Sequence, residues 1–452
     1  MTADRFVSPD HIRSLFSQSM SHMYRTEVPL YGTLVELVGE TNARVLDAQP
    51  ELAGQMQRSG ERERLDVERH GAIRVGTAQE LCTLRRLFAV MGMQPVGYYD
   101  LSVAGVPVHS TAFRPVDGEA LMRNPFRVFT SLLRLELIED EALRAQAADI
   151  LSRRTIFTPG ALQLIAQCER DGGLNEEDAW RFVVEALETF RWHNAATVSL
   201  DTYHALHAAH RLVADVVSFR GPHINHLTPR TLDIDAAQAA MHARGIAAKA
   251  VIEGPPRREC PILLRQTSFK ALEELVHFPS GADNAAGTHT ARFGEIEQRG
   301  LALTPKGRAL YDTLLAQARE GGGSTGGDYM QRLQAAFAAF PDDHATLRRE
   351  GLGYYRYALT DAGRAVPATE RALPAEVLIE RGLAVAEPII YEDFLPVSAA
   401  GIFQSNLGGE EQRAYAARAN RDAFEQALGA PVADEFAIYE RLQAQSLAQL
   451  AV

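Results

Sequence analysis

The sequence predicts an α+β fold: two β-α-β-β-β modules pair into a cupped sheet, with helical N-terminal, middle and C-terminal additions. Two observations predict this arrangement. The order strand, helix, strand, strand, strand occurs twice along the chain. A histidine precedes an arginine by four residues in the first strand of each copy, as His70 and Arg74 and again as His226 and Arg230. An internal repeat of this size indicates a repeated architecture.

The repeat divides the chain into five expected segments. They are a helical lead-in (1–67), the first module (68–137), a helical insertion (138–215), the second module (216–304) and a C-terminal helical region that closes the cavity (305–452).

Local signals place the elements of the lead-in and the first module. Ser8 precedes Pro9 at the expected start of the first helix. Thr77 and Glu80 form a capping box, and Gly92 ends the helix that follows it. Strands are expected over 69–75, 95–101, 106–113 and 126–137.

The second module repeats these signals. Asp233 is expected to cap a helix that ends at Gly245. Strands are expected over 223–230, 248–253, 261–269 and 288–299. Because residues three apart in a strand point to opposite faces, the first of these strands aims either His223 or His226 into a site. The repeat favours His226, which aligns with His70.

Composition excludes several classes of protein. The 452 residues are 46% hydrophobic, and the formal net charge of −12 argues against a broad basic face for nucleic acid. No apolar run reaches the roughly 18 residues of a membrane span, and the N-terminus lacks the pattern of a secretory signal. The cysteines Cys82, Cys168 and Cys260 form no CxxC motif, which predicts a reduced, cytoplasmic protein without a disulfide framework.

Three further motifs have bland interpretations. His204, His207 and His210 drift off a single helical face, so they are expected to be solvated or to cap a helix. Glu320–Gly327 is glycine-rich without a following GKS or GKT, so it is expected to be a flexible linker. The segment 391–403, which contains Ser398, is either core or the wall of a pocket.

Pairing of the modules would bring His70 and His226 to one central metal site. The third ligand would come from Glu295 or Glu297, which share a face of an alternating strand, so alternation leaves the choice open. Two imidazoles and one carboxylate suit non-haem Fe(II) and leave positions open for substrate and dioxygen. The alternative is that both histidines are satisfied core residues and both glutamates face solvent.

Arg74 shares a strand face with His70 and would place a cation near the metal. A guanidinium there can hold a substrate carboxylate through two parallel hydrogen bonds. The alternative is an ion pair with one of the 58 acidic residues of the chain.

With these residues in place, the sequence resembles the 2-oxoadipate dioxygenase/decarboxylase family. The resemblance covers most of the chain, and its most specific blocks are 68–77, 221–233, 292–300 and 391–404. It implies a fold of the vicinal-oxygen-chelate superfamily and conversion of 2-oxoadipate and dioxygen into 2-hydroxyglutarate and carbon dioxide, a step of lysine breakdown.

The resemblance also implies the roles of particular residues. Fe(II) would be bound by His70, His226 and Glu295, which act in catalysis together with Arg74. The substrate, a small 2-oxo dicarboxylic acid, would contact Arg74, Val397 and Ser398. Two other functions remain open from the sequence: a glyoxalase-like isomerase or hydrolase that uses Zn or Ni, and a ligand-binding protein without catalysis.

Overall fold

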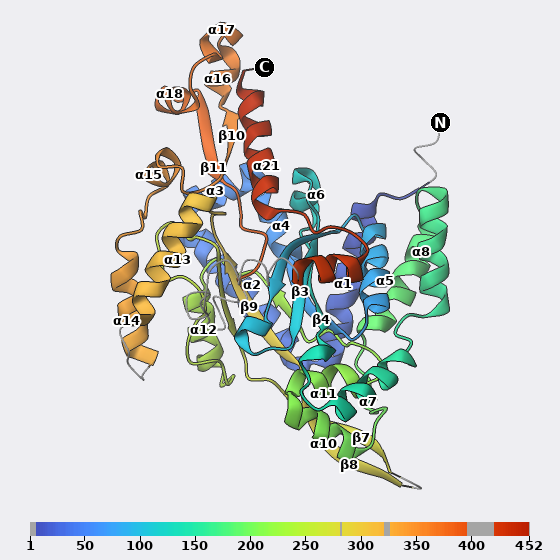
Figure 1. Cartoon of the computed structure of the whole chain (residues 1–452). Helices are drawn as coiled ribbons and strands as arrows, with labels where there is room; N and C mark the ends of the chain where they lie inside the picture. The colour runs from blue at the N-terminus through green and yellow to red at the C-terminus, as the bar shows by residue number, and fades with distance from the viewer. Residues whose placement is uncertain (1–5, 281–282, 321–325, 396–419, 452) are drawn as a thin grey trace. The chain divides into compact units, whose positions relative to one another are not determined.

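The structure is a computed structural model that describes residues 6–280, 283–320, 326–395 and 420–451 (Figure 1). The chain divides into two units. Unit 1 comprises Met1–Lys249, Thr267–Glu297 and Pro396–Ala433, and unit 2 comprises Ala250–Gln266, Gln298–Leu395 and Asp434–Val452. Both helices and strands are present, which confirms the predicted α+β class.

The largest sheet has seven strands in the order β2-β3-β4-β1-β5-β9-β6. Their bounds are β1 Arg69–Val75, β2 Gln94–Asp100, β3 Val108–Arg114, β4 Arg127–Leu133, β5 His226–Pro229, β6 Leu264–Ser268 and β9 Phe293–Arg299. β1 runs parallel to β4, and β5 runs parallel to β9. The first strand of each predicted module therefore has the last strand of the same module beside it.

The two first strands, β1 and β5, pair with each other in antiparallel orientation. His70 lies opposite Thr228, and Ala72 lies opposite His226. In the repeat, His70 corresponds to His226 and Ala72 corresponds to Thr228. Exchanging the two strands therefore turns the pair His70–Thr228 into the pair His226–Ala72, so the ladder is locally two-fold symmetric at this point. This pairing joins the halves of the sheet and places the two repeated histidines close together.

Alternation along β1 separates core from site. Ile73 and Val75 are completely buried in the main hydrophobic cluster of unit 1, where Phe16 and Phe88 also lie. His70 and Arg74 occupy the opposite set of positions on the strand. The strand is therefore anchored by one face and offers the other for chemistry.

The second module departs from the predicted strands. Ala248 and Glu253 form only isolated bridges, so no strand fills 248–253. The single strand expected over 288–299 is two strands: β8 (Asp283–Thr290) pairs with β7 (Glu273–Ser280) in a separate hairpin, and β9 begins at Phe293. The chain turns at Arg292, whose Nη1 lies 2.6 Å from Glu27 Oε2 and whose other nitrogens contact Glu274.

Other predicted strands are shorter than expected, including the strand predicted over 261–269, which spans only Leu264–Ser268. The strand expected over 126–137 ends at Leu133, and a short 3-10 helix, η2 (Leu135–Leu137), follows it. The strand expected over 223–230 begins only at His226. His223 therefore lies outside the sheet, and strand alternation does not decide where its side chain points.

The predicted helix signals are confirmed. Ser8 Oγ accepts from His11 N at the start of α1, Thr77 and Glu80 make both bonds of the capping box of α5, and Asp233 caps α12. Gly92 and Gly245 have φ of 67° and 70°, the left-handed conformation that favours glycine after a helix. The bounds are α1 Pro9–Glu27, α2 Pro29–Ala48, α3 Pro50–Ser59, α4 Glu61–Val67, α5 Ala78–Val90, α6 Gly118–Arg123 and α12 Ile234–Ala243, and η1 spans Ser102–Ala104.

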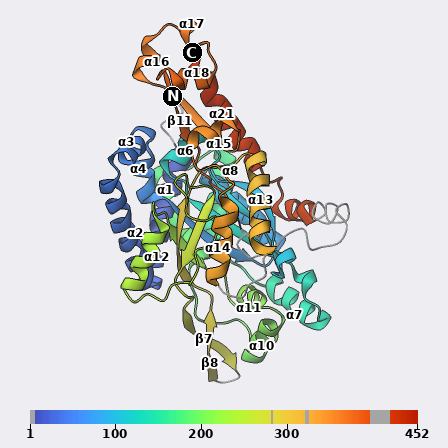
Figure 2. The same cartoon turned by 90° about the vertical axis from the view of Figure 1, so that its left-hand side faces the viewer.

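The insertion between the modules is helical, as predicted. It contains α7 Glu141–Ser152, α8 Pro159–Asp171, α9 Glu176–Leu187, η3 Glu188–Phe190, α10 Leu200–Ala209 and α11 Arg211–Val217. The hairpin β7–β8 lies beside α10 (Figures 1 and 2), and His277 N donates to Asn194 O at 2.8 Å. α12 lies beside α2 (Figure 2). The insertion and the hairpin together border the end of unit 1 at which β1 terminates.

Unit 2 combines helices with a two-stranded sheet that the sequence did not predict. Its elements are α13 Pro305–Glu320, α14 Gly326–Phe337, α15 His344–Arg349, β10 Tyr355–Leu359, α16 Asp361–Ala365, α17 Ala368–Arg371, α18 Ala375–Glu380, β11 Ala384–Pro388 and α21 Glu435–Leu450. α21 binds β10 through side chains: Gln443 Oε1 accepts from Tyr355 N at 2.8 Å, and Ser446 Oγ accepts from Tyr357 N at 3.1 Å.

The linker predicted over 320–327 is only partly described. Helix α13 includes Glu320 and helix α14 begins at Gly326, so the prediction was wrong at both ends, and 321–325 lie outside the described residues. Among the described helices, none has the length and apolar character that a bilayer crossing requires.

Candidate metal centre

Pairing of β1 with β5 brings the two repeated histidines together. The rings of His70 and His226 have centroids 5.4 Å apart and stand almost perpendicular, at 87°. His70 is 1% exposed. Burial lowers the pKa of His226 to about 4, assisted by the charges of His70 and Arg74 and opposed by Glu295. His226 is therefore a neutral imidazole near pH 7, the form that binds metal ions.

Glu295 on β9 completes a cluster of three donors. Its Oε2 lies 3.1 Å from Nε2 of His70 and 3.7 Å from Nε2 of His226. Thr228 Oγ1 donates to the same oxygen at 3.2 Å. One ligand atom from each of these two histidines and this glutamate lies within 4.8 Å of the others. The cluster has the composition and spacing of a mononuclear metal site.

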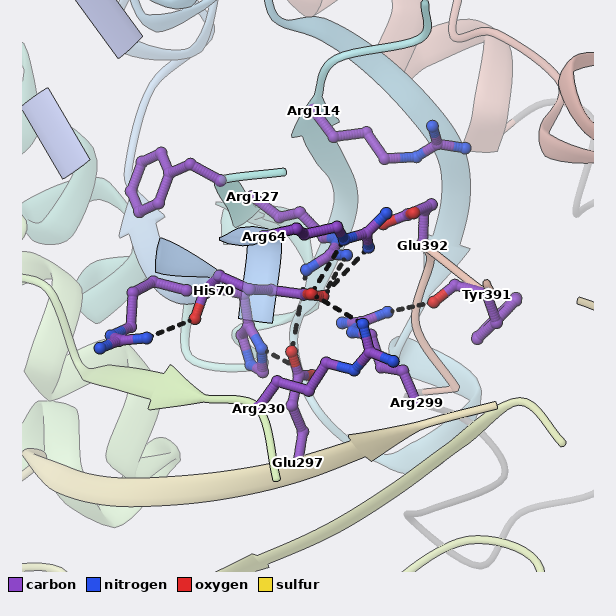
Figure 3. Close-up of polar contacts among 12 residues, drawn as sticks. Arg64, His70, Arg114, Arg127, Arg230, Glu297, Arg299, Tyr391 and Glu392 are labelled. Atoms are coloured by element: carbon purple, nitrogen blue, oxygen red, sulfur yellow. Dashed lines mark hydrogen bonds and ion pairs between the residues drawn. The ribbon is translucent and has the colours of Figure 1, made fainter. Parts of the chain in front are cut away.

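Glu297 lies on the same face of β9 but reaches the other nitrogen of the histidine. Its Oε2 is 2.9 Å from Nδ1 of His70 (Figure 3). A carboxylate at Nδ1 favours a proton there and leaves the Nε2 lone pair directed toward Glu295. Strand alternation could not distinguish Glu295 from Glu297. Their contacts do, because Glu295 lies at Nε2 of His70 and Glu297 lies at Nδ1.

These contacts test whether a cation fits the cluster. With the proton of His70 at Nδ1, two imidazole lone pairs and a carboxylate oxygen converge, and they repel one another unless a cation or an added proton lies between them. Burial opposes ionisation of Glu295, but both histidines favour it and its pKa lies below the ordinary value. The Nδ1 atom of His226 is buried and has no hydrogen-bond partner among the described residues. The donor set suits a divalent transition metal.

A buried group of arginines surrounds Glu68 behind the cluster. Arg64, Arg127 and Arg230, which are labelled in Figure 3, lie 3.0, 2.7 and 3.1 Å from its carboxylate. Arg127 Nη1 is also 3.7 Å from Glu297 Oε1, so the group extends to the carboxylate beside His70. Burial opposes the charge of Glu68, but the three arginines lower its pKa well below the ordinary value. This group was not predicted from the sequence, because Arg127 and Arg230 lie 59 and 162 residues from Glu68.

The two repeated arginines have different surroundings. Arg230 joins the Glu68 group and also contacts Glu61 at 3.3 Å. Arg74 instead makes the ion pair considered in the sequence analysis, from Nη1 to Asp215 Oδ2 at 2.8 Å. Of the two repeated arginines, Arg230 is therefore committed to the Glu68 group, whereas Arg74 lies outside that group.

Other predicted site residues can be placed or set aside. Val397 and Ser398 lie outside the described residues. His204 and His207 are exposed on α10, and His210 Nδ1 accepts from Leu212 N at the start of α11, as the solvated or capping interpretation predicted. His223 belongs to a second cluster with Asp215 and His289, which the sequence analysis did not find.

Fold and site together define an α+β protein with a buried cluster of two histidines and one carboxylate at the junction of two half-sheets. A family model described as 2-oxoadipate dioxygenase/decarboxylase matches residues 16–406. The chain belongs to the 2-oxoadipate dioxygenase/decarboxylase family.

Named relatives agree over nearly the whole chain. The 2-oxoadipate dioxygenase/decarboxylase of Pseudomonas putida is 61% identical over 99% of this chain and 97% of its own length. The Escherichia coli protein of the same name is 62% identical over 97% of this chain and 98% of its own. The crystal structure of the Pseudomonas putida hydroxyglutarate synthase in complex with 2-oxoadipate has a TM-score of 0.90 and 59% identity, covering 99% of this chain and 100% of that chain.

Proposed function

We propose that this chain is an Fe(II)-dependent dioxygenase and decarboxylase that converts 2-oxoadipate and dioxygen into 2-hydroxyglutarate and carbon dioxide, within lysine breakdown. The observation that carries the proposal is the convergence of His70, His226 and Glu295 in a chain of this family. The solved complex of a relative with 2-oxoadipate supports the choice of substrate.

The proposed reaction balances without an external reductant. The bond between C1 and C2 of 2-oxoadipate breaks, and C1 leaves as carbon dioxide with its own two oxygens. One atom of dioxygen enters the new carboxylate at the former keto carbon. The other atom forms the hydroxyl on the adjacent carbon. Both atoms of dioxygen therefore end in the five-carbon product.

His70, His226 and Glu295 would hold the ferrous ion, and the remaining coordination positions would be available to the substrate and dioxygen. Ferrous iron in such a site supplies binding of the 2-oxo acid group and electrons for dioxygen. Glu297 would keep the proton of His70 at Nδ1, so that Nε2 stays available as a ligand. Removing such a partner of a ligating histidine typically weakens metal binding by about 10- to 100-fold.

Arg74 would bind the distal carboxylate of the substrate. Its guanidinium is a permanent cation, and its side chain is 21% exposed, so an anion can reach it. Val397 and Ser398 would complete the substrate site through apolar contact and hydrogen bonding. These assignments predict selectivity for diacids over 2-oxo acids that lack the second carboxylate.

Dioxygen uptake tests the function directly. Protein reconstituted with Fe(II) without air should consume dioxygen on addition of 2-oxoadipate and release 2-hydroxyglutarate. With isotopically heavy dioxygen, the product should carry both heavy atoms. Turnover of 2-oxoadipate in strict absence of dioxygen, or a product with no heavy oxygen, would contradict the proposal.

A further inference from the structure

A second buried cluster lies at the end of β1, built from groups that the proposed reaction does not use. Asp215 at the end of α11 is its centre. His289 Nε2 lies 2.9 Å from Asp215 Oδ1, and His223 Nε2 lies 3.4 Å from the same oxygen. Tyr203 OH lies 2.9 Å from the other ring nitrogen of His289. These side chains come from the helical insertion, from β8 and from the loop before β5.

The spacing would also suit a metal ion, but the partners point to another role. The carboxylate of Asp215 already binds a permanent cation, since Arg74 Nη1 contacts Oδ2 at 2.8 Å. A divalent ion would have to share that carboxylate with a guanidinium, at a large electrostatic cost in a buried site. Tyr203 occupies one nitrogen of His289, and Asn225 Nδ2 lies 3.2 Å from Nε2 of His223.

The charges of the cluster agree with this interpretation. Burial lowers the pKa of His223 to about 3, so its ring is neutral near pH 7. Burial opposes ionisation of Asp215, but the imidazoles of His223 and His289 and the guanidinium of Arg74 lower its pKa below the ordinary value. The cluster is therefore one ionised carboxylate, contacted by His223 and His289 and turned toward one arginine.

Arg74 uses only part of its guanidinium for this contact. Among the described residues, the structure records a hydrogen bond from Nη1 alone, which leaves Nε and Nη2 for a second partner. Arg74 and Asp215 also line a cavity of about 470 Å³ together with His289, Arg211 and Phe293. The Phe293 ring packs on the ring of His226, with centroids 4.7 Å apart, so this cavity borders the candidate metal centre.

We infer that Asp215 is a positioning residue for Arg74: it holds Nη1 so that the Nε and Nη2 edge faces the carboxylate of a bound diacid. This inference rests on the proposed function, because it assumes that Arg74 binds the substrate. His223 and His289 contact the carboxylate of Asp215, and Tyr203 contacts His289. These contacts hold Asp215 in the position from which it orients Arg74. Tyr203 and His289 therefore contribute to substrate binding through the position of Arg74.

The test is a double-mutant cycle measured as binding. 2-Oxoadipate is titrated calorimetrically into air-free Fe(II) protein, using the wild type, Asp215→Asn, Arg74→Ala and the double variant. Asp215→Asn should weaken binding on the order of tenfold to a hundredfold, because a displaced guanidinium loses its alignment. The same substitution in the Arg74→Ala background should add no further loss. Equal losses in both backgrounds would overturn the inference.

Two further measurements distinguish this role of Asp215 from a merely structural effect of its substitution: binding of a second ligand, and metal analysis. 2-Oxohexanoate lacks the distal carboxylate, so its affinity should be the same for wild type and Asp215→Asn. Metal content should stay at one ion per chain in both proteins. A second ion per chain that disappears in His223→Ala would overturn the inference in favour of a second metal site.

Two controls complete the design. Asp149→Asn, on the exposed part of α7, should bind 2-oxoadipate like the wild type. Should Asp215→Asn fail to fold, Tyr203→Phe tests the same chain of contacts and should weaken 2-oxoadipate binding severalfold, with 2-oxohexanoate unaffected. Wild-type affinity in Tyr203→Phe would then overturn the inference.

A wild type that turns over no 2-oxoadipate contradicts the proposed function, whereas active protein with normal affinity in Asp215→Asn contradicts only this inference.

Discussion

The two nitrogens of a single histidine separate the roles of two glutamates. Glu295 and Glu297 have the same parity on β9, so strand alternation offered no means of choosing between them, and only the family resemblance favoured Glu295. Glu295 faces Nε2 of His70 and is also close to His226, whereas Glu297 faces Nδ1. The proposed ligand and the proposed orienting partner of His70 therefore lie two residues apart on one strand.

Substitution of each glutamate should have a different effect on metal binding. Glu295→Ala removes a proposed ligand and should leave no stoichiometric Fe(II) after desalting. Glu297→Gln keeps the ligand set and should weaken Fe(II) binding by about 10- to 100-fold. Metal analysis by mass spectrometry and Fe(II) titration measure both effects. Equal metal content in wild type and Glu295→Ala would refute the assignment.

The repeated arginines form a second matched pair. Arg230 is 4% exposed and contacts Glu68 and Glu61, so its loss removes one of the three arginines that compensate the buried Glu68 carboxylate. Arg230→Ala should lower the free energy of unfolding by about 3–5 kcal/mol. Arg74→Ala should lower it much less and chiefly weaken 2-oxoadipate binding. Urea unfolding of both variants measures the two losses of stability. Equal losses would show that Arg74 and Arg230 have the same structural role and would contradict a separate binding role for Arg74.

At the scale of the element, the site depends on the register of two short strands. The sequence repeat predicted that two modules pair and bring His70 and His226 to one site. That the first strands themselves form a ladder, with His70 opposite Thr228 and Ala72 opposite His226, was not predicted. Local signals also gave the helix starts at Ser8, Thr77 and Asp233, because a cap needs only a few neighbouring residues. The hairpin β7–β8 was missed, since alternation continues through the turn at Arg292.

Gly71 keeps β1 and β5 at their observed spacing. A Cβ at this position would lie 2.6 Å from Ile224 Cδ1 and 3.2 Å from the backbone oxygen of His226. Gly71→Ala should therefore cost about 1–3 kcal/mol of stability by overpacking and should weaken metal binding by shifting His226.

The second substitution Ile224→Val removes the closer of these atoms. The double variant should recover most of the stability and the metal affinity that Gly71→Ala loses. Thermal unfolding and Fe(II) titration of the single and double variants measure this. Failure of Ile224→Val to restore either property would show that the contact does not set the strand spacing.

For the whole molecule, the sequence predicted the kinds of secondary structure better than the contacts between residues far apart in the chain. The α+β class, the helical insertion and the two histidines followed from period and repeat. The partners of Glu68 and of Arg74 did not, because Asp215 lies 141 residues from Arg74. A single sequence records no contact between such positions. The five-segment division and the closing role of 305–452 stay predictions.

Stability of the molecule should fall in mild acid. His109 is buried against Phe424 and Tyr98, and burial lowers its pKa from 6.5 to about 4. Between these two values the unfolded chain binds the proton and the folded chain does not, so stability is lost as pH falls from 6.5 toward 4. The full effect is on the order of 3 kcal/mol.

Urea unfolding across this pH range tests the effect. His109→Phe should flatten the dependence of unfolding free energy on pH relative to the wild type. His204→Gln, on the exposed face of α10, is the matched control and should keep the wild-type slope. An unchanged slope in His109→Phe would mean that this histidine does not contribute to acid sensitivity.

The central claim is that two half-sheets bring His70, His226 and Glu295 to a single ion. Anomalous diffraction from crystals of the Fe(II)-reconstituted protein locates that ion directly. We expect one iron peak per chain, within bonding distance of Nε2 of both histidines and of the Glu295 carboxylate, with Glu297 outside the coordination shell. A peak among Asp215, His223 and His289, or no ordered iron near His70, would contradict it.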